Sequence, residues 1–192
     1  MKIKFFVFIL IAVLCFLAYF NSLGNPFIWD DEALVVKNTL IRNVENLPLS
    51  FTSDLYFGTS GSNFYRPLQT VSYIFDYHFW QLNPFGYHLT NIILQAGVSF
   101  LVFLFVFNLI ESLPVALTSA VFFAVSPVHT EAVTYISGRA EMLMGFFVIL
   151  GLLFFIRSQK ESARQARLFY ILALSSFFLA LLSKELAVVF PF

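Results

Sequence analysis

Residues 5–20 read FFVFILIAVLCFLAYF, an unbroken apolar run without a charged side chain. Two lysines, Lys2 and Lys4, come immediately before this run. At about 1.5 Å of rise per helical residue, the run and its flanks are just long enough to cross a hydrocarbon core of about 30 Å. The stretch therefore predicts a membrane-spanning helix over about residues 4–21.

The composition of the whole chain also points to lipid as the solvent. Of its 192 residues, 59% are hydrophobic and 11% are charged, and the mean hydropathy is +0.84. An ordinary soluble domain carries roughly 25% charged residues, so too little polar surface is present to cover a water-facing globule. We therefore expect an all-α polytopic membrane protein. The formal net charge of zero provides no basic field, so no nucleic-acid partner is expected.

Four more apolar blocks predict four further spans, at about residues 88–110, 113–127, 141–157 and 168–183. The sequence then stops inside another apolar run, residues 186–192, which is too short to cross a bilayer. We therefore expect residues 1–192 to be the N-terminal membrane part of a longer chain, with a further span starting near residue 186.

The basic residues predict the orientation of these spans. Lys2 and Lys4 precede the first span, and a basic loop with Arg157, Lys160, Arg164 and Arg167 follows the fourth. An even number of spans separates the two groups, so both lie on one side, which the positive-inside rule makes cytoplasmic. Residues 21–87, residues 126–141 and Lys184-Glu185 are then expected together on the extracytoplasmic face, of a bacterial inner membrane or the endoplasmic reticulum.

The N-terminal run also fits a cleaved signal peptide, which begins with the same basic and apolar pattern. The run is long for a signal core, however, and residues 21–24 (NSLG) are a poor cleavage site, so we favour an uncleaved anchor. The single cysteine, Cys15, excludes an intrachain disulfide and a cysteine-based metal cluster.

An amphipathic helix is predicted in the first outer segment, starting at Pro67. Apolar residues recur there at spacings of three and four (Leu68, Val71, Phe75, Phe79), and another face carries Gln69, Ser72 and Asp76. Its aromatic residues (Tyr73, Tyr77, Trp80) suit the membrane interface, so we expect the helix to lie in the headgroup layer. A turn is predicted after it, at residues 83–86.

The first candidate site is the acidic stretch that follows Trp29, namely Asp30, Asp31 and Glu32. A charge at mid-bilayer costs roughly 2.5 to 3.5 kcal/mol, so these residues are expected at or above the interface. A solvated loop explains them equally simply, but three of the chain's 11 acids are contiguous here. Repulsion between adjacent carboxylates can raise the pKa of one of them and make it a proton acceptor near neutrality.

Two other polar clusters fall on the same predicted face. One contains His129, Glu131, Arg139 and Glu141, and the other is Lys184-Glu185. Arg66, which precedes the amphipathic helix, joins them. A zinc site of the metalloprotease type is not supported, because it requires a second histidine four residues from the first. Snorkelling at the ends of spans is the simpler explanation for Lys184 and Arg66.

Together these residues describe a site at the outer membrane surface. A carboxylate suits deprotonation of a hydroxyl group, and the cations Arg66, Arg139 and Lys184 suit a phosphate leaving group on a lipid. This combination indicates glycosyl transfer from a polyprenyl-phosphate-linked sugar, although a transporter can use similar charges.

Several strings in the chain resemble one family. They are residues 21–32 (NSLGNPFIWDDE), 65–68 (YRPL), 83–91 (NPFGYHLTN), 126–133 (SPVHTEAV), 137–141 (SGRAE) and 182–191 (LSKELAVVFP). In this order they are similar to the transmembrane and tetratricopeptide-repeat-containing glycosyltransferases of the GT-C fold, which are protein O-mannosyltransferase-like.

This resemblance implies a catalytic base in the first outer loop and a polyprenyl-phosphate sugar as donor, with a protein or glycan as acceptor. It implies Asp31, in the Asp-Glu pair, as the first choice for the base and Asp30 as the second. The residues expected to bind the donor phosphate or the substrate are Arg66, His129, Glu131, Arg139, Lys184 and Glu185. No residue is assigned to a metal.

Two other classes of function stay open from the sequence. A transporter of lipid-linked sugars would need polar residues in the middle of its spans, whereas Asn91, Gln95 and Asn108 lie near the ends of the second one. A non-catalytic membrane subunit would be favoured if the gene ends at Phe192.

Overall fold

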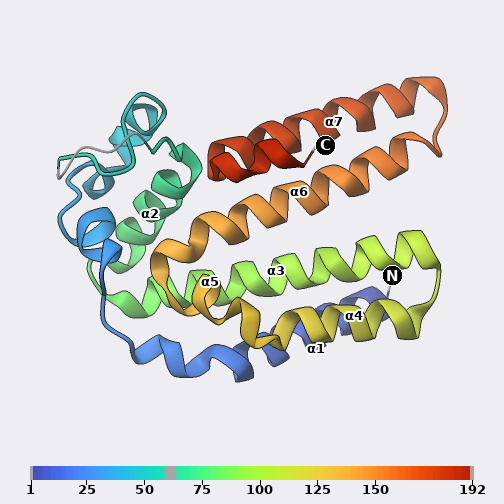
Figure 1. Ribbon diagram of the computed structural model, residues 1–192, viewed down its shortest axis with the longest axis horizontal. Coiled ribbons are helices and arrows are strands. Elements are labelled where there is room, and N and C mark those ends of the chain that lie inside the picture. Colours follow the sequence, from blue (N-terminus) through green and yellow to red (C-terminus); the bar gives the residue numbers. More distant parts are fainter. Residues whose placement is uncertain (1, 59–63, 191–192) are drawn as a thin grey trace.

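The computed structural model describes residues 2–58 and 64–190, and within these ranges the regular structure is entirely helical. Five long helices run roughly side by side along the length of the molecule (Figure 1). They are α1 (Lys2–Tyr19), α3 (Pro84–Ile110), α4 (Leu113–Val125), α6 (Arg139–Ser158) and α7 (Ala163–Ser183). Short 3-10 turns extend α1 (η1, Phe20–Gly24) and follow α7 (η7, Glu185–Val189).

Membrane-spanning length is reached by four of the described helices, or by five if α4 is counted together with the segment after it. That segment, residues 127–134, is bent by 44° from α4 and contains η5 (Pro127–His129) and α5 (Thr130–Thr134). The prediction of an all-α polytopic membrane protein is therefore confirmed. A further span starting at residue 186 stays a prediction, because η7 ends at Val189 and residues 191–192 lie outside the described ranges.

The surface of the bundle is apolar, as lipid contact requires. Large hydrophobic side chains are strongly exposed on several of the long helices, for example Phe6 (68%), Phe122 (71%) and Phe178 (59%). In water such a surface would cost about 25 cal/mol for each Å² exposed. We therefore attribute these side chains to the lipid-facing side of the spans.

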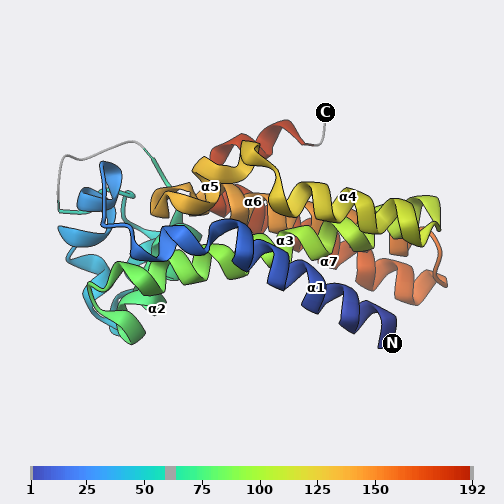
Figure 2. The same cartoon turned by 90° about the horizontal axis from the view of Figure 1, so that it is seen from below.

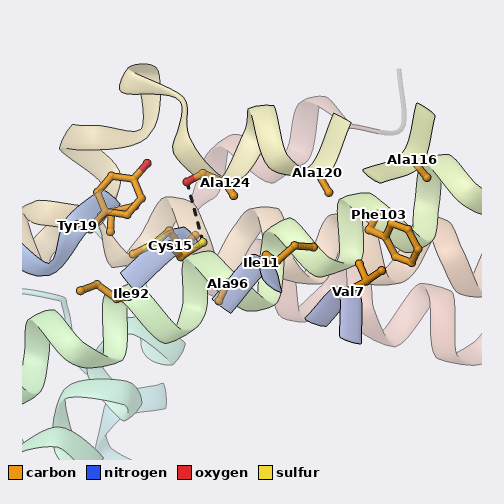
Figure 3. Packing of buried hydrophobic residues seen from close by; sticks show 12 residues of the cluster. Val7, Ile11, Cys15, Tyr19, Ile92, Ala96, Phe103, Ala116, Ala120 and Ala124 are labelled. Carbon is orange, nitrogen blue, oxygen red and sulfur yellow. Dashed lines mark hydrogen bonds between the residues drawn. The ribbon is translucent and has the colours of Figure 1, made fainter. Parts of the chain in front are cut away.

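The N-terminal half of the bundle is held by small residues. On α4, Ala116, Ala120 and Ala124 recur every four residues and are fully buried. They pack with an α1 stripe of the same spacing (Val7, Ile11, Cys15, Tyr19) and with α3, as Figure 3 shows. Small side chains let helix backbones approach closely, which is the main source of attraction between helices in lipid.

At one end of the bundle the segment between α1 and α3 forms a folded cap (Figures 1 and 2). It contains η2 (Glu32–Val36, π-helical), η3 (Leu40–Arg42), η4 (Val44–Phe51) and the α-helix α2 (Pro67–Trp80). A second apolar core joins the cap to the bundle, with Tyr87 of α3 and Ile136 packed against the cap residues Leu34, Val35, Leu40, Ile41, Leu55, Tyr73 and Ile74. We call this unit, residues 25–58 and 64–83, the outer cap.

The predicted amphipathic helix exists as α2, and its polar face points into the protein. Gln69 and Asp76 are buried, whereas Phe75 and Phe79 are 48% and 73% exposed. The exposed apolar face suits the headgroup layer, as expected. Tyr73 was predicted at the interface, and this was wrong: it is buried, and its hydroxyl donates to the Ile136 carbonyl at 3.1 Å.

Three predicted boundaries differ from the structure. Residues 83–86 are not a turn, because Asn83 caps α3 by accepting a hydrogen bond from the Phe85 N–H at 3.1 Å and the helix begins at Pro84. Proline fits this first helical position, where no backbone donor is needed. α7 begins at Ala163 rather than near residue 168, so Arg164 and Arg167 are helical. The connection 126–141 is likewise folded, into η5, α5 and η6 (Ile136–Gly138).

The course of the chain places the polar clusters together. The N-terminus and the α6–α7 connection lie at one end of the bundle, and the outer cap, α5 and the end of α7 lie at the other (Figure 1). This arrangement agrees with the predicted alternation of the spans.

Labelling from the two sides of a membrane tests this arrangement. Glu45 in the cap and Ser162 in the α6–α7 connection are both exposed, so Glu45→Cys and Ser162→Cys, each in a Cys15→Ala background, should react with an impermeant maleimide from opposite faces. The Cys15→Ala background alone should not react. Labelling of both positions from one face would contradict the arrangement of spans.

Candidate functional site

The two adjacent aspartates of the outer cap have different environments. Asp31 is 1% exposed, and its carboxylate accepts hydrogen bonds from the backbone N–H groups of Ile28 (3.2 Å) and Ser137 (3.0 Å). Asp30 is exposed, and its backbone N–H donates to the Tyr135 hydroxyl at 2.9 Å. Asp31 therefore ties the cap to the segment just before α6, while the Asp30 carboxylate lies at the surface, where the Tyr56 side chain is hydrogen-bonded to it.

The pKa of Asp31 is raised to about 6, and the main cause is burial. Charge repulsion from Asp30 raises this pKa further, but the hydrogen bonds from Ile28 and Ser137 oppose both effects. A raised pKa in the acidic triplet was expected from repulsion between neighbours. Desolvation is the larger cause, and it acts on one member of the triplet because the fold buries only that carboxylate.

Two tyrosines flank Asp30. Burial raises the pKa of Tyr56, and the Asp30 charge raises it further while the Arg66 charge acts in the opposite direction. The pKa of Tyr135 is also raised, again chiefly by burial. The charges of both Asp30 and Arg66, which belong to the two segments of the outer cap, thus act on Tyr56.

Arg139, predicted to bind the donor phosphate, is instead completely buried. Its Nη1 lies 2.5 Å from Oδ2 of Asp76, its Nε donates to Asn91 Oδ1 at 2.8 Å, and its Nη2 donates to the Tyr87 carbonyl at 2.8 Å. Its guanidinium also lies over the Tyr73 ring, 4.8 Å from the centroid. All three nitrogens are engaged within the protein, so this geometry favours a structural role for Arg139.

Arg66 and Lys184 are more accessible, and each is paired with a glutamate. Arg66 donates two hydrogen bonds to Glu185, at 2.9 and 2.6 Å, and the Arg66 side chain is 15% exposed. The Lys184 ammonium lies 2.7 Å from Glu141. The Arg66–Glu185 pair joins the start of α2 to the segment after α7, and the Lys184–Glu141 pair joins the end of α7 to the start of α6.

The last two predicted site residues, His129 and Glu131, lie on the short helices after α4. The His129 ring packs against Phe123 with a centroid separation of 4.2 Å. It lines a cavity of about 130 Å³ together with Gln95 and Glu141. Glu131 is exposed at the start of α5. The structure thus brings Asp30, Arg66, Lys184 and Glu185 to one end, with His129 and Glu131 on the helices beside them.

Sequence reasoning gave no role in this region to Asp76, Tyr56 or Tyr135. The ion pair of Asp76 had one usable signal, because Asn91 and Arg139 interrupt or border apolar runs and intramembrane polar groups seek partners. The tyrosines had no such signal. Among residues 2–58 and 64–190, no group of three histidine, cysteine, aspartate or glutamate side chains is arranged to hold a metal ion.

Comparison with known proteins identifies related sequences. The family model described as dolichyl-phosphate-mannose-protein mannosyltransferase matches residues 55–192. A protein O-mannosyl-transferase of Caenorhabditis elegans is 31% identical over 175 residues, which is 87% of this chain and 25% of that protein. Protein O-mannosyl-transferase TMTC3 of Homo sapiens is 36% identical over 146 residues, or 73% of this chain and 16% of that protein.

The chain therefore spans about a quarter of the length of these relatives or less. No solved structure matches it significantly. The resemblance found in the sequence motifs is confirmed, since the family model covers most of the chain.

The buried ion pair generates a stability prediction. Asp76→Asn should leave Arg139 charged and uncompensated inside the bundle, and Arg139→Gln should do the same to Asp76. Each should cost about 3 to 5 kcal/mol of folding free energy, because breaking a buried pair leaves a desolvated charge. Thermal melting of the purified protein measures this loss.

Arg157→Gln is the matched control on the same helix. Its pair with Glu161 is exposed, the Arg157 side chain being 63% accessible, so the loss should stay below about 1 kcal/mol. The double variant Asp76→Asn/Arg139→Gln should lose less than the sum of the single losses. Additive losses, or a control as damaging as Asp76→Asn, would refute the assigned role of the pair.

Proposed function

Because the chain belongs to the dolichyl-phosphate-mannose-protein mannosyltransferase family, we propose that it is the N-terminal part of a membrane glycosyltransferase. The enzyme transfers a sugar from a polyprenyl-phosphate-linked donor to a protein or glycan acceptor. The names of the relatives favour mannose as the sugar and a protein as the acceptor. The outer cap faces the extracytoplasmic side, and the N-terminus is cytoplasmic.

One observation carries this proposal. The exposed carboxylate of Asp30 and the Arg66 guanidinium both belong to the outer cap. Glu185, which follows Lys184 in the chain, accepts two hydrogen bonds from Arg66. Proton acceptor and cations thus lie at the same end of the bundle, which we place at the membrane surface, where a lipid phosphate and a polar acceptor can both be present. The transporter alternative is less well supported, because the buried Asn91 and Gln95 amides donate to backbone carbonyls within the bundle.

In the proposed reaction, Asp30 accepts the proton of an acceptor hydroxyl. The hydroxyl oxygen forms a bond to the anomeric carbon of the sugar as the bond from that carbon to the phosphate oxygen breaks. The polyprenyl phosphate leaves with the negative charge, which Arg66 and Lys184 stabilise. The family resemblance implied Asp31, in the Asp-Glu pair, as the first choice for the base. We propose Asp30 because a general base has to reach its proton, and Asp31 is buried with both oxygens bonded.

The choice between the two aspartates is testable in the complete protein. Asp30→Asn removes the proton acceptor and should lower turnover by roughly 10² to 10⁴-fold with the melting temperature unchanged, since the side chain is exposed. Asp31→Asn should lower the melting temperature as well, because it disturbs the hydrogen bonds to Ile28 and Ser137. Turnover is measured with donor at saturation.

Glu32→Gln is the control, since Glu32 is an exposed neighbour in the same triplet. It should change turnover only slightly. If Asp30→Asn is active and Asp31→Asn is stable but inactive, Asp31 is the base, as the motif implied. If both variants remain active, the acidic triplet is only a solvated loop.

The ion pairs predict opposite effects on donor affinity. Glu185 occupies the donors of Arg66 that a phosphate would use, so Glu185→Gln should lower the donor KM by several-fold. Arg66→Gln should raise the donor KM, and neither change should greatly alter the KM for the acceptor. A Glu185→Gln variant with a raised donor KM would show that Glu185 positions Arg66 and does not compete with the phosphate.

A further inference from the structure

Trp29 has a backbone conformation that its side chain disfavours. Its φ angle is 47°, in the left-handed region, and its side chain is 81% exposed. A bulky residue in this region is a genuine outlier, because Cβ approaches the following carbonyl oxygen. Such strain persists only where the surrounding structure imposes it, and it is concentrated at functional sites.

The surroundings impose it through contacts on both sides of Trp29. Before it, the Ile28 N–H donates to the Asp31 carboxylate, and after it the Asp30 N–H donates to the Tyr135 hydroxyl. The Tyr135 ring meets the indole edge to face, with centroids 5.9 Å apart and planes at 80°. Asp31 in turn accepts from Ser137, so the turn at residues 28–31 is fixed to the start of α6.

These contacts hold a large flat aromatic face on the surface of the outer cap, next to the exposed Asp30 in the chain. Burial of the indole does not explain the arrangement, because Trp29 remains 81% exposed despite its contact with Tyr135. A partner outside the described residues would stabilise this face by covering it, and tryptophan is prominent among residues that dominate binding energy.

We propose that Trp29, backed by Tyr135, is the platform on which the polypeptide acceptor docks. This inference rests on the proposed function, because it assumes that Asp30 meets the acceptor hydroxyl. The donor is held from its phosphate at Arg66 and Lys184, whereas the acceptor arrives from solvent and must present its hydroxyl to Asp30. The indole adjoins Asp30 in the chain and faces that solvent.

A lipid surface is the competing partner for an exposed tryptophan. An interfacial anchor requires no particular backbone conformation, since any flexible loop can place an indole in the headgroups. The strained turn and its three fixing hydrogen bonds instead set the indole in a defined orientation to Asp30, as recognition of an extended chain requires.

Peptide binding tests the proposal without any turnover. A fluorescent peptide of serine, threonine and alanine is titrated with the complete protein in lipid nanodiscs, without donor, and its anisotropy is recorded. Trp29→Ala and Trp29→Gly should weaken peptide binding by about tenfold or more, and Trp29→Phe should restore most of it. Phe51→Ala, which truncates another exposed aromatic of the cap, should leave binding unchanged.

The melting temperature separates docking from a structural role. Glycine tolerates a positive φ, so Trp29→Gly should melt at the same temperature as the unaltered protein or higher. A melting temperature lowered by several degrees would make the indole a structural contact and overturn the proposal. Peptide affinity unchanged in Trp29→Ala, or no saturable peptide binding by the unaltered protein, would also overturn it.

Fluorescence quenching tests the alternative that Trp29 anchors the protein in lipid. If brominated lipids quench the part of the fluorescence that Trp29→Phe removes, and peptide does not reduce this quenching, Trp29 is a lipid anchor and the proposal fails. The proposed transferase is judged separately, by release of sugar from a polyprenyl-phosphate sugar donor. If the unaltered protein releases no sugar from this donor, the proposed function is refuted, whatever the peptide titration shows.

Discussion

The buried guanidinium of Arg139 is the constraint from which the outer end of this protein is built. A charge removed from water must be paired and hydrogen-bonded inside the protein. Asp76 on α2, Asn91 and the Tyr87 carbonyl on α3 meet this requirement together. The polar face of α2 therefore turns inward, and the outer cap takes a defined position on the bundle.

The candidate site depends on this arrangement through a short chain of contacts. Ser137, two residues before Arg139, donates its backbone N–H to Asp31. Asp31 closes the turn that carries Trp29 and Asp30, and Tyr135 supports that turn from the side. The buried charge of Arg139 thus helps to fix the position of the exposed Asp30 carboxylate.

Arg66 and Lys184 differ from Arg139 in burial, and we therefore assign them a different role. Arg139 is fully enclosed, whereas the glutamates paired with Arg66 and Lys184 are more than half exposed. Exposed pairs contribute little to stability because water screens them. A ligand phosphate can therefore replace Glu185 at modest cost, whereas Asp76 is buried with Arg139 and is not accessible to a ligand.

Several features of the protein follow from the sequence alone. The apolar runs predict the long helices and the end of the bundle at which the polar clusters gather, because a helix has to cross the bilayer completely and backbone groups in lipid must pair within it. The spacing of three and four between apolar residues after Pro67 predicts α2, because these residues share one face of a helix. The family motifs predict the membership that the family model supports.

Tertiary structure decided the role of each polar residue. By residue type alone, Arg66 and Arg139 are equivalent cations and Asp30 and Asp31 are equivalent acids, and only the family resemblance ranked Asp31 above Asp30. Desolvation and partner geometry distinguish them, and both arise from segments far apart in the chain, such as Asp31 with Ser137 or Arg66 with Glu185. The helices could be predicted because hydrophobicity acts locally along the chain, but the site could not, because the electrostatic environment of a side chain exists only after distant segments have packed around it.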